Sequence, residues 1–545
     1  MKKIKTLLII LLMAAEIILL NGEIYTQVTQ EWAKRFNSGG TVNDMVVAMA
    51  LDTSNNIIVT GWIQTTDQNA NFCTVKYNPA GIFLWSAIFN RPAGSNSIDQ
   101  PTALGVDIQG NIYVTGASER TGYGTNDYCT IKYNSSGVQQ WVRRYNRGGI
   151  RGHISNAIAI DNLGFVYVTG ASQGDNINYD IATIKYTQNG DSVWVRRYDS
   201  PYHLDDVAYS IAVDNNGDVY IVGGISYASN STKIIALKYN SNGVQQWVNI
   251  GINGFLKKIK LDINNNVITA GIAIFGAPNG DDYLTVKYNS AGVQQWLATY
   301  NGTGTGVIND IINDLDIDIQ GNVFVTGRSL ILTDWDYATI KYNSSGAQQW
   351  VKTHNGMGNN YDEAKAVKVD SVGNIYVTGR ASGPSPNYPN YFTTIKYNTS
   401  GVQQWLASYP GSGIDLVIDK NQNVYVAGGN SDAGFGVDYY TIKYVQFVGI
   451  TPIVGNIPDK YLLYQNYPNP FNPSTIISYY LPRKNKVTLK VFDILGKEIS
   501  TLVNSYQESG EYKFNFKPEN ISTGIYLYKL QTEDFADTKM MVYQK

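Results

Sequence analysis

The sequence predicts an all-β protein: an eight-bladed β-propeller of four-stranded antiparallel blades, followed by a small, immunoglobulin-like β-sandwich. Only 16% of the 545 residues are charged, while Gly and Tyr are abundant at 52 and 41 residues. Disordered chains carry more charge and fewer aromatic residues, so this composition excludes them. A tryptophan-containing pattern recurs every 49 to 56 residues, and a different pattern begins at Pro458.

Three markers define the repeated unit, and each occurs eight times, which predicts eight units. The tryptophans are Trp32, Trp85, Trp141, Trp194, Trp247, Trp296, Trp350 and Trp405. Lys-Tyr pairs begin at Lys76, Lys132, Lys185, Lys238, Lys287, Lys341, Lys396 and Lys443. An aspartate ends an apolar segment at Asp52, Asp107, Asp161, Asp214, Asp262, Asp318, Asp370 and Asp419.

Each unit contains four short strands. In the third unit, runs such as FVYVTG and IATIKY alternate with segments rich in Asp, Asn and Gly. Val, Ile, Tyr and Thr with a period of two favour strands, and Asp, Asn and Gly favour tight turns. One four-stranded antiparallel sheet per unit of this length is typical of a propeller blade.

Residue size predicts the order of strands within a blade. Small residues such as Ala48, Ala103 and Ala157 precede the marker aspartates of the first units, so this strand is expected to lie nearest the crowded axis. The Trp strand is then outermost. The lone Trp32 strand at the start should complete the last blade beside the Lys443-Tyr444 strand, which closes the ring and leaves no open edge.

The lysine and tryptophan markers are interpreted as structural. A side chain that occurs in every blade most simply packs between neighbouring sheets. Lysine is expected to lay its stem on apolar surface and to expose its ammonium group.

Repeats such as VDIQGNIYVTG, DYCTIKYNSSGVQQW and IDIQGNVFVTG resemble the bacterial β-propeller repeat family called SBBP. The resemblance implies an extracytoplasmic propeller. It supplies no catalytic residues.

The C-terminal segment resembles the type A C-terminal sorting domain of the type IX (Por) secretion system. The resemblance rests on YLLYQNYPNPFNPSTIISYYLP, VTLKVFDILGKEISTLV and STGIYLYKLQ. It implies that the type IX machinery is a partner and that the chain ends outside the cell or at the outer-membrane surface. Alternating residues at 486–492 and 524–530, with a turn at 495–497, independently predict a β-sandwich.

These patterns divide the chain into four parts. Residues 1–27 are a predicted signal peptide, because Lys2, Lys3 and Lys5 precede an apolar run. Residues 28–444 form the predicted propeller, 445–457 the linker where processing would occur, and 458–545 the sorting domain. No transmembrane segment is expected in the mature chain.

The charge balance, the cysteines and a serine motif exclude several kinds of site. Residues 28–457 hold 28 basic and 33 acidic side chains, which argues against nucleic-acid binding. Cys73 and Cys129 occupy the same register of neighbouring blades, too far apart for a disulfide, so two buried free thiols are expected. A G-x-S-x-G match at 170–174 lies between two strands rather than at a nucleophile elbow. No catalytic residue and no cofactor are predicted.

Five aspartates share a position eight residues before the marker aspartates and form the first candidate site: Asp44, Asp99, Asp206, Asp310 and Asp362. They either cap the loop that leads into the inner strand or surround one channel mouth as a polar-ligand or cation site, with calcium as the possible ion. An EF-hand is excluded at Asp214, because Ile225 stands where the bidentate Glu is required.

Charged residues replace the small inner-strand residues in the later units and form the second candidate site: Lys258, Lys260, Asp314, Asp316, Lys368 and Asp415. Their period of two places them on one face of each strand, near the axis. The simpler interpretation is a structural ion-pair network, and the alternative is a substrate-binding channel.

The predicted function is a secreted or cell-surface binding module whose ligand is a carbohydrate or a protein. Two alternatives remain open. One is an extracellular hydrolase or lyase that acts on polysaccharide through carboxylates at the channel mouth, and the other is a structural component of a surface layer.

Overall fold

The computed structural model describes residues 28–38, 43–64, 70–90, 99–120, 125–148, 150–175, 177–228, 231–276, 280–304, 309–387, 389–431, 437–446, 460–466, 469–518 and 521–544. The predicted signal peptide and most of the predicted linker lie outside these ranges. All described elements are strands, and none of the described segments is a helix that could cross a membrane. The described residues divide into two compact units, one at Val28–Gln446 and one at 460–544.

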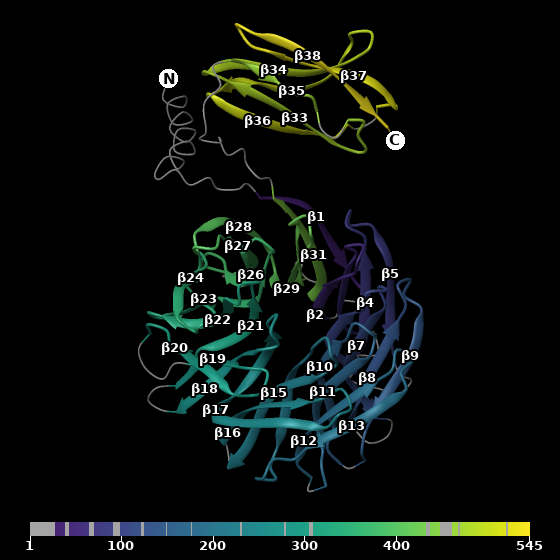
Figure 1. Cartoon of the computed structure of the whole chain (residues 1–545), viewed down its shortest axis with the longest axis vertical. Helices are drawn as coiled ribbons and strands as arrows, with labels where there is room; N and C mark the ends of the chain where they lie inside the picture. Colours follow the sequence, from purple (N-terminus) through teal and green to yellow (C-terminus); the bar gives the residue numbers. More distant parts are fainter. Residues whose placement is uncertain are drawn as a thin grey trace. The chain divides into compact units, whose positions relative to one another are not determined.

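The first unit is a β-propeller, as predicted, with antiparallel sheets around a central axis (Figure 1). Blade 1 contains β2 (Asp44–Leu51), β3 (Ile57–Gln64), β4 (Ala70–Tyr77) and β5 (Phe83–Phe89). Blade 2 contains β6 (Asp99–Val106), β7 (Ile112–Arg120), β8 (Thr125–Tyr133) and β9 (Gln139–Tyr145). Blade 3 contains β10 (His153–Ile160), β11 (Val166–Gln173), β12 (Tyr179–Tyr186) and β13 (Ser192–Tyr198).

Blades 4 and 5 form one seven-stranded sheet because they share a long strand. Its order is β14 (Asp206–Val213), β15 (Val219–Ala228), β16 (Ser231–Tyr239), β17 (Gln245–Leu261), β18 (Val267–Gly276), β19 (Gly280–Tyr288) and β20 (Gln294–Tyr300). The first part of β17 is the outer strand of blade 4 and pairs with β16. Its last part is the inner strand of blade 5 and pairs with β18.

The remaining blades return to four strands. Blade 6 contains β21 (Ile311–Ile317), β22 (Val323–Ile331), β23 (Asp334–Tyr342) and β24 (Gln348–His354). Blade 7 contains β25 (Glu363–Val369), β26 (Ile375–Ser382), β27 (Asn390–Tyr397) and β28 (Gln403–Pro410). Blade 8 contains β29 (Ser412–Ile418), β30 (Val424–Ser431), β31 (Val437–Gln446) and β1 (Val28–Phe36).

The antiparallel pairing of β1 with β31 confirms the predicted closure by the first strand, with Trp32 opposite Lys443. The marker aspartates form the predicted hairpin turns. Asp107 Oδ1 accepts from the backbone N–H groups of Gln109 at 3.0 Å and Asn111 at 2.8 Å. Each of these turns therefore follows the inner strand directly.

The tryptophan and lysine markers share one acceptor in the next blade. Lys76 Nζ and Trp85 Nε1 both donate to the backbone oxygen of Ser135, at 3.0 and 3.1 Å. We call this pair of donors on one carbonyl a clasp. The predicted exposure of the ammonium group is wrong, because Lys76 is only 2% exposed. A buried ammonium group requires hydrogen-bond partners, and the carbonyl of the neighbouring turn supplies one.

The clasp recurs around the ring. In four further cases, a lysine and a tryptophan donate to the same backbone oxygen. The oxygen of Gln188 accepts from Lys132 and Trp141, that of Ser241 from Lys185 and Trp194, that of Thr399 from Lys341 and Trp350, and that of Pro79 from Lys443 and Trp32. The last of these joins blade 8 to blade 1. The same turns contain a glycine against the tryptophan ring. A Cβ atom on Gly137 would lie 2.5 Å from Cδ2 of Trp85.

At the seam, a side chain replaces the missing turn. The chain has no turn between β31 and β1, so no turn carbonyl faces blade 7. Instead, Oε1 of Gln446 accepts from Lys396 Nζ and, at 3.3 Å, from Trp405 Nε1. The sequence markers did not reveal this role, because Gln446 lies outside the repeated pattern.

Cys73 and Cys129 are not joined in a disulfide and are fully buried, as predicted. Burial raises the pKa of the Cys73 thiol well above its usual range. Both side chains pack as small residues in the hydrophobic core.

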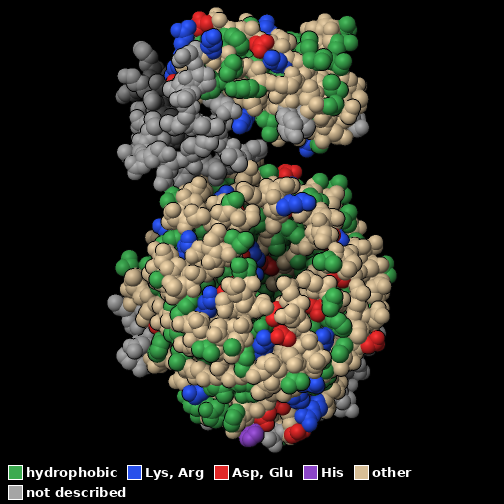
Figure 2. Space-filling view, in the orientation of Figure 1, with side chains coloured by type: hydrophobic (Ala, Val, Ile, Leu, Met, Phe, Trp, Pro, Cys, Tyr) green, Lys and Arg blue, Asp and Glu red, His purple; other side chains and the backbone are tan. Residues whose placement is uncertain are grey.

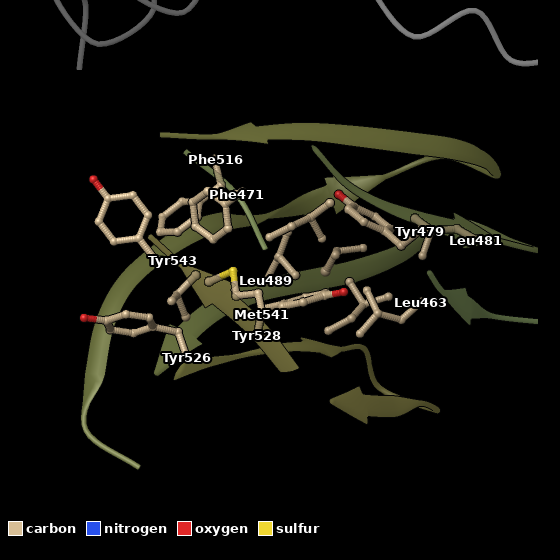
Figure 3. Packing of buried hydrophobic residues seen from close by; sticks show 14 residues of the cluster. Leu463, Phe471, Tyr479, Leu481, Leu489, Phe516, Tyr526, Tyr528, Met541 and Tyr543 are labelled. Atoms are coloured by element: carbon tan, nitrogen blue, oxygen red, sulfur yellow. The ribbon is translucent and has the colours of Figure 1, made fainter. Parts of the chain in front are cut away.

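The C-terminal unit is the predicted β-sandwich. One sheet contains β32 (Leu462–Leu463), β33 (Thr475–Leu481) and β36 (Gly510–Phe516). The other contains β35 (Glu498–Gln507), β34 (Asn485–Asp493), β37 (Gly524–Gln531) and β38 (Ala536–Tyr543). Leu489, Tyr479, Phe516, Tyr528 and Met541 belong to the buried core between them (Figure 3). The predicted turn forms after β34, where Gly496 has a φ of 81°.

We expect Gly137→Ala to destabilise the propeller more than Gly110→Ala. Both glycines have positive φ, 83° and 78°, which costs alanine about 1 kcal/mol. Only Gly137 lies against a tryptophan ring, whereas a Cβ atom on Gly110 would have its nearest contact at 3.6 Å. Overpacking should add about 1–3 kcal/mol. Thermal unfolding of both variants measures the difference, and equal losses of stability would contradict the packing role of the clasp.

We expect Gln446→Leu to lower stability by about 1–3 kcal/mol, because it leaves buried donors on Lys396 and Trp405 without their acceptor. Gln349→Leu, at an exposed position of β24, is the matched control. Thermal unfolding should separate the two variants. The seam role is wrong if both unfold at the temperature of the parent chain.

Candidate functional site

A cavity of about 580 Å³ lies on the propeller axis and is lined by residues of every inner strand. Figure 2 shows the hollow at the centre of the propeller, with basic and acidic side chains inside it. A volume of this size lies within the range that holds small ligands. The cavity is therefore the candidate functional site.

Each inner strand has a bulge at the same position. In the pairings of β6, β10, β17 and β21 with their neighbours, the register shifts around Thr102, Asn156, Lys257 and Asn313, and the other four inner strands shift at the equivalent residue. A bulge leaves one residue unpaired and re-aims its side chain. Seven of these eight bulged residues line the cavity, and Asn313 is the exception.

Polar side chains at the bulges connect consecutive inner strands. Asn156 Nδ2 donates to the backbone oxygen of Ala208 at 2.8 Å, and Asn313 Nδ2 donates to that of Ala364 at the same distance. Thr102 Oγ1 donates to the oxygen of Ser155 at 2.6 Å. The acceptor in each case directly precedes the next bulge. Sequence reasoning missed this ring, although a change of phase in the apolar alternation of each inner strand could have indicated it.

The two sides of the cavity differ chemically. Blades 1 to 3 contribute small or apolar residues, among them Ala48, Met49, Ala103, Leu104 and Ala157. Blades 5 to 8 contribute Lys257, Lys258, Asp314, Lys365, Lys368 and Asp415. The cavity therefore has one largely apolar wall and one charged wall.

Asp314 is the centre of the charged wall. Its carboxylate lies 3.0 Å from Lys368 Nζ and 3.6 Å from Lys258 Nζ, and it accepts from the backbone N–H of Val367 at 3.0 Å. Burial would raise the pKa of Asp314, but Lys368 and Lys258 outweigh burial and hold this pKa well below its usual range. Burial likewise opposes the charge of Lys368, and Asp314 overcomes it and raises the Lys368 pKa.

The other acidic groups also bind the next inner strand. Asp316 accepts from the N–H of Val369 at 2.9 Å and pairs with Lys260 at 3.2 Å. Asp415 accepts from the N–H of Met49 at 2.9 Å. Burial raises the pKa of Asp415, because the attraction of Lys368 offsets it only in part. The predicted charged set thus lies on inner strands, with its carboxylates turned toward backbone N–H groups.

The lysines are the more accessible members of this wall. The side chains of Lys258 and Lys365 are 45% and 33% exposed, against 10% and 8% for Asp314 and Glu363, the carboxylates with which they pair. Burial lowers the pKa of Lys257 to about 8. An incoming ligand would therefore meet ammonium groups before carboxylates.

The first candidate set lies elsewhere, at the beginning of the inner strands. Asp44, Asp99, Asp206, Asp310 and Asp362 are at most 1% exposed. Their partners belong to neighbouring loops. Asp362, for example, accepts from the N–H groups of Gly356 at 2.5 Å and Ser382 at 2.6 Å. Burial raises the pKa of Asp206 to about 7.

These contacts match the capping interpretation of the five aspartates, while their role in ligand or cation binding stays a prediction. The described part of the chain contains no group of three or more His, Cys, Asp or Glu side chains arranged to hold a metal ion. The cation prediction therefore receives no support from clustered ligands in these ranges.

Comparison with known families identifies two parts of the chain. Residues 465–544 match the family described as secretion system C-terminal sorting domain. Residues 84–119 and 140–178 match the SBBP β-propeller repeat.

Relatives of known name or structure are distant. The chain is 24% identical over 476 residues to an uncharacterized WD repeat-containing protein of Acanthamoeba polyphaga mimivirus, which covers 73% of this chain. The chain spans only 30% of the length of that relative.

Similar solved structures include PorZ, an essential bacterial surface component of the type-IX secretion system of Porphyromonas gingivalis. Identity is 13% and the TM-score 0.39, with 92% of this chain and 66% of that chain covered. The Dos1 propeller is 8% identical with a TM-score of 0.46, and the match covers 76% of this chain and 95% of that chain. The polysaccharide lyase Uly1 is 12% identical with a TM-score of 0.41, and the match covers 66% of this chain and 91% of that chain.

The sorting domain implies interaction with the type IX secretion machinery. The chain therefore combines SBBP-type propeller repeats with a type IX C-terminal sorting domain, and it is exported to the cell surface or the extracellular space.

Proposed function

We propose that the propeller is an extracellular binding module that holds an acidic carbohydrate in its central cavity. The observation that carries this proposal is the asymmetric lining of the cavity, with accessible lysines opposite a wall of small apolar residues. Ligand sites combine apolar surface with a few placed polar groups. A sugar chain with carboxylate or sulfate groups matches both walls, because its rings have apolar faces and its charges suit ammonium groups.

The exposure of the lysines in the charged wall supports ligand binding rather than a purely structural role. A structural network would use its charges internally, as Asp314 does with Lys368 and Lys258. Two lysines of the cavity lining, Lys258 and Lys365, nevertheless remain 45% and 33% exposed while paired. Their ammonium groups have further donors to offer, since lysine carries three.

An enzymatic role is the second candidate, and one observation favours it. Lys257 has its pKa lowered to about 8, so a fraction of this side chain is neutral at neutral pH and could act as a base. The lyase and hydrolase alternatives require product release, whereas a binding module leaves its ligand intact.

We expect Lys258→Gln combined with Lys365→Gln, at two lysines that line the cavity, to weaken binding of an acidic polysaccharide about tenfold, at about 0.7 kcal/mol for each lost charge contact. Lys420→Gln, at an exposed turn residue outside the cavity, is the matched control. Calorimetry with the full chain would measure binding to acidic and neutral polysaccharides and to an acidic peptide, with product release followed in parallel.

Each outcome of this experiment decides something specific. Equal binding by the parent and the double variant would remove the cavity as the site. Binding of the peptide alone would replace carbohydrate by protein as the ligand. Any product from the polysaccharide would replace the binding module by an enzyme.

Binding of an acidic ligand should also weaken as the pH rises through about 8. The ammonium group of Lys257 loses its proton near this value, and the attraction to an anion is lost with the charge. Lys257→Met should bind about two- to fivefold more weakly than the parent at pH 7 and show no change between pH 7 and 9. Titrations at three pH values test this, and an unchanged pH dependence in Lys257→Met would assign the effect to another group.

A further inference from the structure

A second cavity, of about 560 Å³, is lined by residues of blades 7, 8 and 1 and is nearly as large as the central cavity. Its lining includes Met45 and Val46 of β2, Pro410 of β28, and Ser412 and Ile414 of β29. We call this cavity the side pocket. Its volume lies within the range that holds small ligands.

The side pocket lies where blade 8 begins without a loop. β28 ends at Pro410 and β29 begins at Ser412, so Gly411 alone connects the two blades, whereas residues 199–205 make the equivalent connection between blades 3 and 4. Gly411 has a φ of 118°, and a Cβ atom on it would lie 2.4 Å from Cε2 of Phe392. The connection is therefore held close to blade 7, and no loop of blade 8 covers this place.

Blade 5 also begins without a loop, but a large side chain stands at the corresponding position. Phe255 and Ser412 both lie seven residues before the marker aspartate of their blade. The ring of Phe255 packs 5.8 Å from that of Tyr209, measured between centroids. The other six blades place at this position Met45, Gln100, Ile154, Val207, Ile311 and Glu363. Ser412 is the smallest of the eight, which leaves room for the side pocket.

The lining of the side pocket is uncharged, unlike that of the central cavity. Among the described residues, none of the side chains that line it is ionisable. Met45 and Pro389 supply apolar surface, and Asn387 and Asn390 supply amide groups. Arg380 Nε donates to Asn390 Oδ1 at 2.8 Å, which orients this amide. Amides donate and accept hydrogen bonds as sugar hydroxyl groups do, whereas a carboxylate would lose water here without gaining a cation.

The side pocket and the central cavity adjoin along two inner strands. Ile414 of β29 lines both. On β2, Met45 and Val46 line the side pocket, and the next three residues line the central cavity. Residues of a strand are about 3.3 Å apart, so positions three residues apart are separated by about 10 Å. One ligand of several linked units can therefore occupy both cavities.

We propose that the side pocket binds an uncharged sugar unit of the same chain whose acidic units occupy the central cavity. The ligand is then a mixed polysaccharide, in which acidic units are joined to neutral ones. This inference rests on the proposed function and narrows its ligand class. A uniformly acidic chain would place a charge in an uncharged pocket, and a neutral chain would leave the lysines of the central cavity unused.

The test compares the full chain with Ser412→Phe, which introduces the side chain that blade 5 has at this position, and with Ser412→Ala as the matched control. Calorimetry uses an oligosaccharide of alternating glucuronate and N-acetylglucosamine units and an oligogalacturonate of the same length. We expect the parent and Ser412→Ala to bind the alternating chain about tenfold more tightly than the oligogalacturonate. Ser412→Phe should lose this preference and keep the parent affinity for the oligogalacturonate.

A second variant avoids any effect of the larger side chain on folding. Asn387 is exposed, so Asn387→Ala should unfold at the temperature of the parent. It should bind the alternating chain about three- to fivefold more weakly, because one hydrogen bond to the neutral unit is lost. Its affinity for the oligogalacturonate should stay unchanged.

The two oligosaccharides separate the side pocket from the proposed function. If neither binds the parent, the proposed function fails, and the assignment of the side pocket fails with it. If both bind the parent equally well, or if Ser412→Phe and Asn387→Ala keep the parent preference, the side pocket is not a sugar site. Binding that still depends on Lys258 and Lys365 would then leave the proposed function standing.

Discussion

The propeller depends on a single kind of contact, in which one backbone oxygen of a turn accepts from a lysine ammonium group and a tryptophan indole of the preceding blade. For Lys76 and Trp85 this oxygen belongs to Ser135. A buried ammonium group is tolerated only with partners, so the turn presents its carbonyl at the same place wherever the clasp forms, whereas the lysines of blades 4 and 5 pair with Asp218 and Asp262. The requirement couples the outer strands, the turn and the glycine below the indole ring. It also explains why these residues recur with the period of the fold.

The inner strands solve a different problem, because they must leave room at the axis and still connect to one another. A bulge in each strand frees backbone groups, and side chains from the neighbouring blade bind them. Asn156 and Asn313 donate to carbonyl oxygens, and Asp314 and Asp415 accept from N–H groups. The same connection can therefore be made by neutral or charged side chains. This freedom allows one wall of the cavity to be charged while the opposite wall stays apolar.

The sequence was sufficient to predict the strands, the propeller, its closure and the sandwich, because each follows from a period or a turn motif within one unit. It also placed Lys258, Asp314 and Lys368 near the axis. The environment of individual side chains was harder to predict. The ammonium group of Lys76 was expected at the surface and is buried, where it binds Asp52 at 2.9 Å and, in the next blade, a carbonyl oxygen 59 residues away. Gln446 and the bulges were missed for a related reason, since their roles arise from contacts between blades.

The closing pair of strands has a consequence for export. Val28 lies opposite Gln446 in the pairing of β1 with β31, so the ring is complete only when both ends of the propeller are in the same compartment. The sorting domain follows β31 in the chain. A propeller stopped halfway through a membrane would lack its eighth blade and its clasp onto Pro79. The eighth blade and its clasp onto Pro79 therefore exist only after the first and the last strand of the propeller have met.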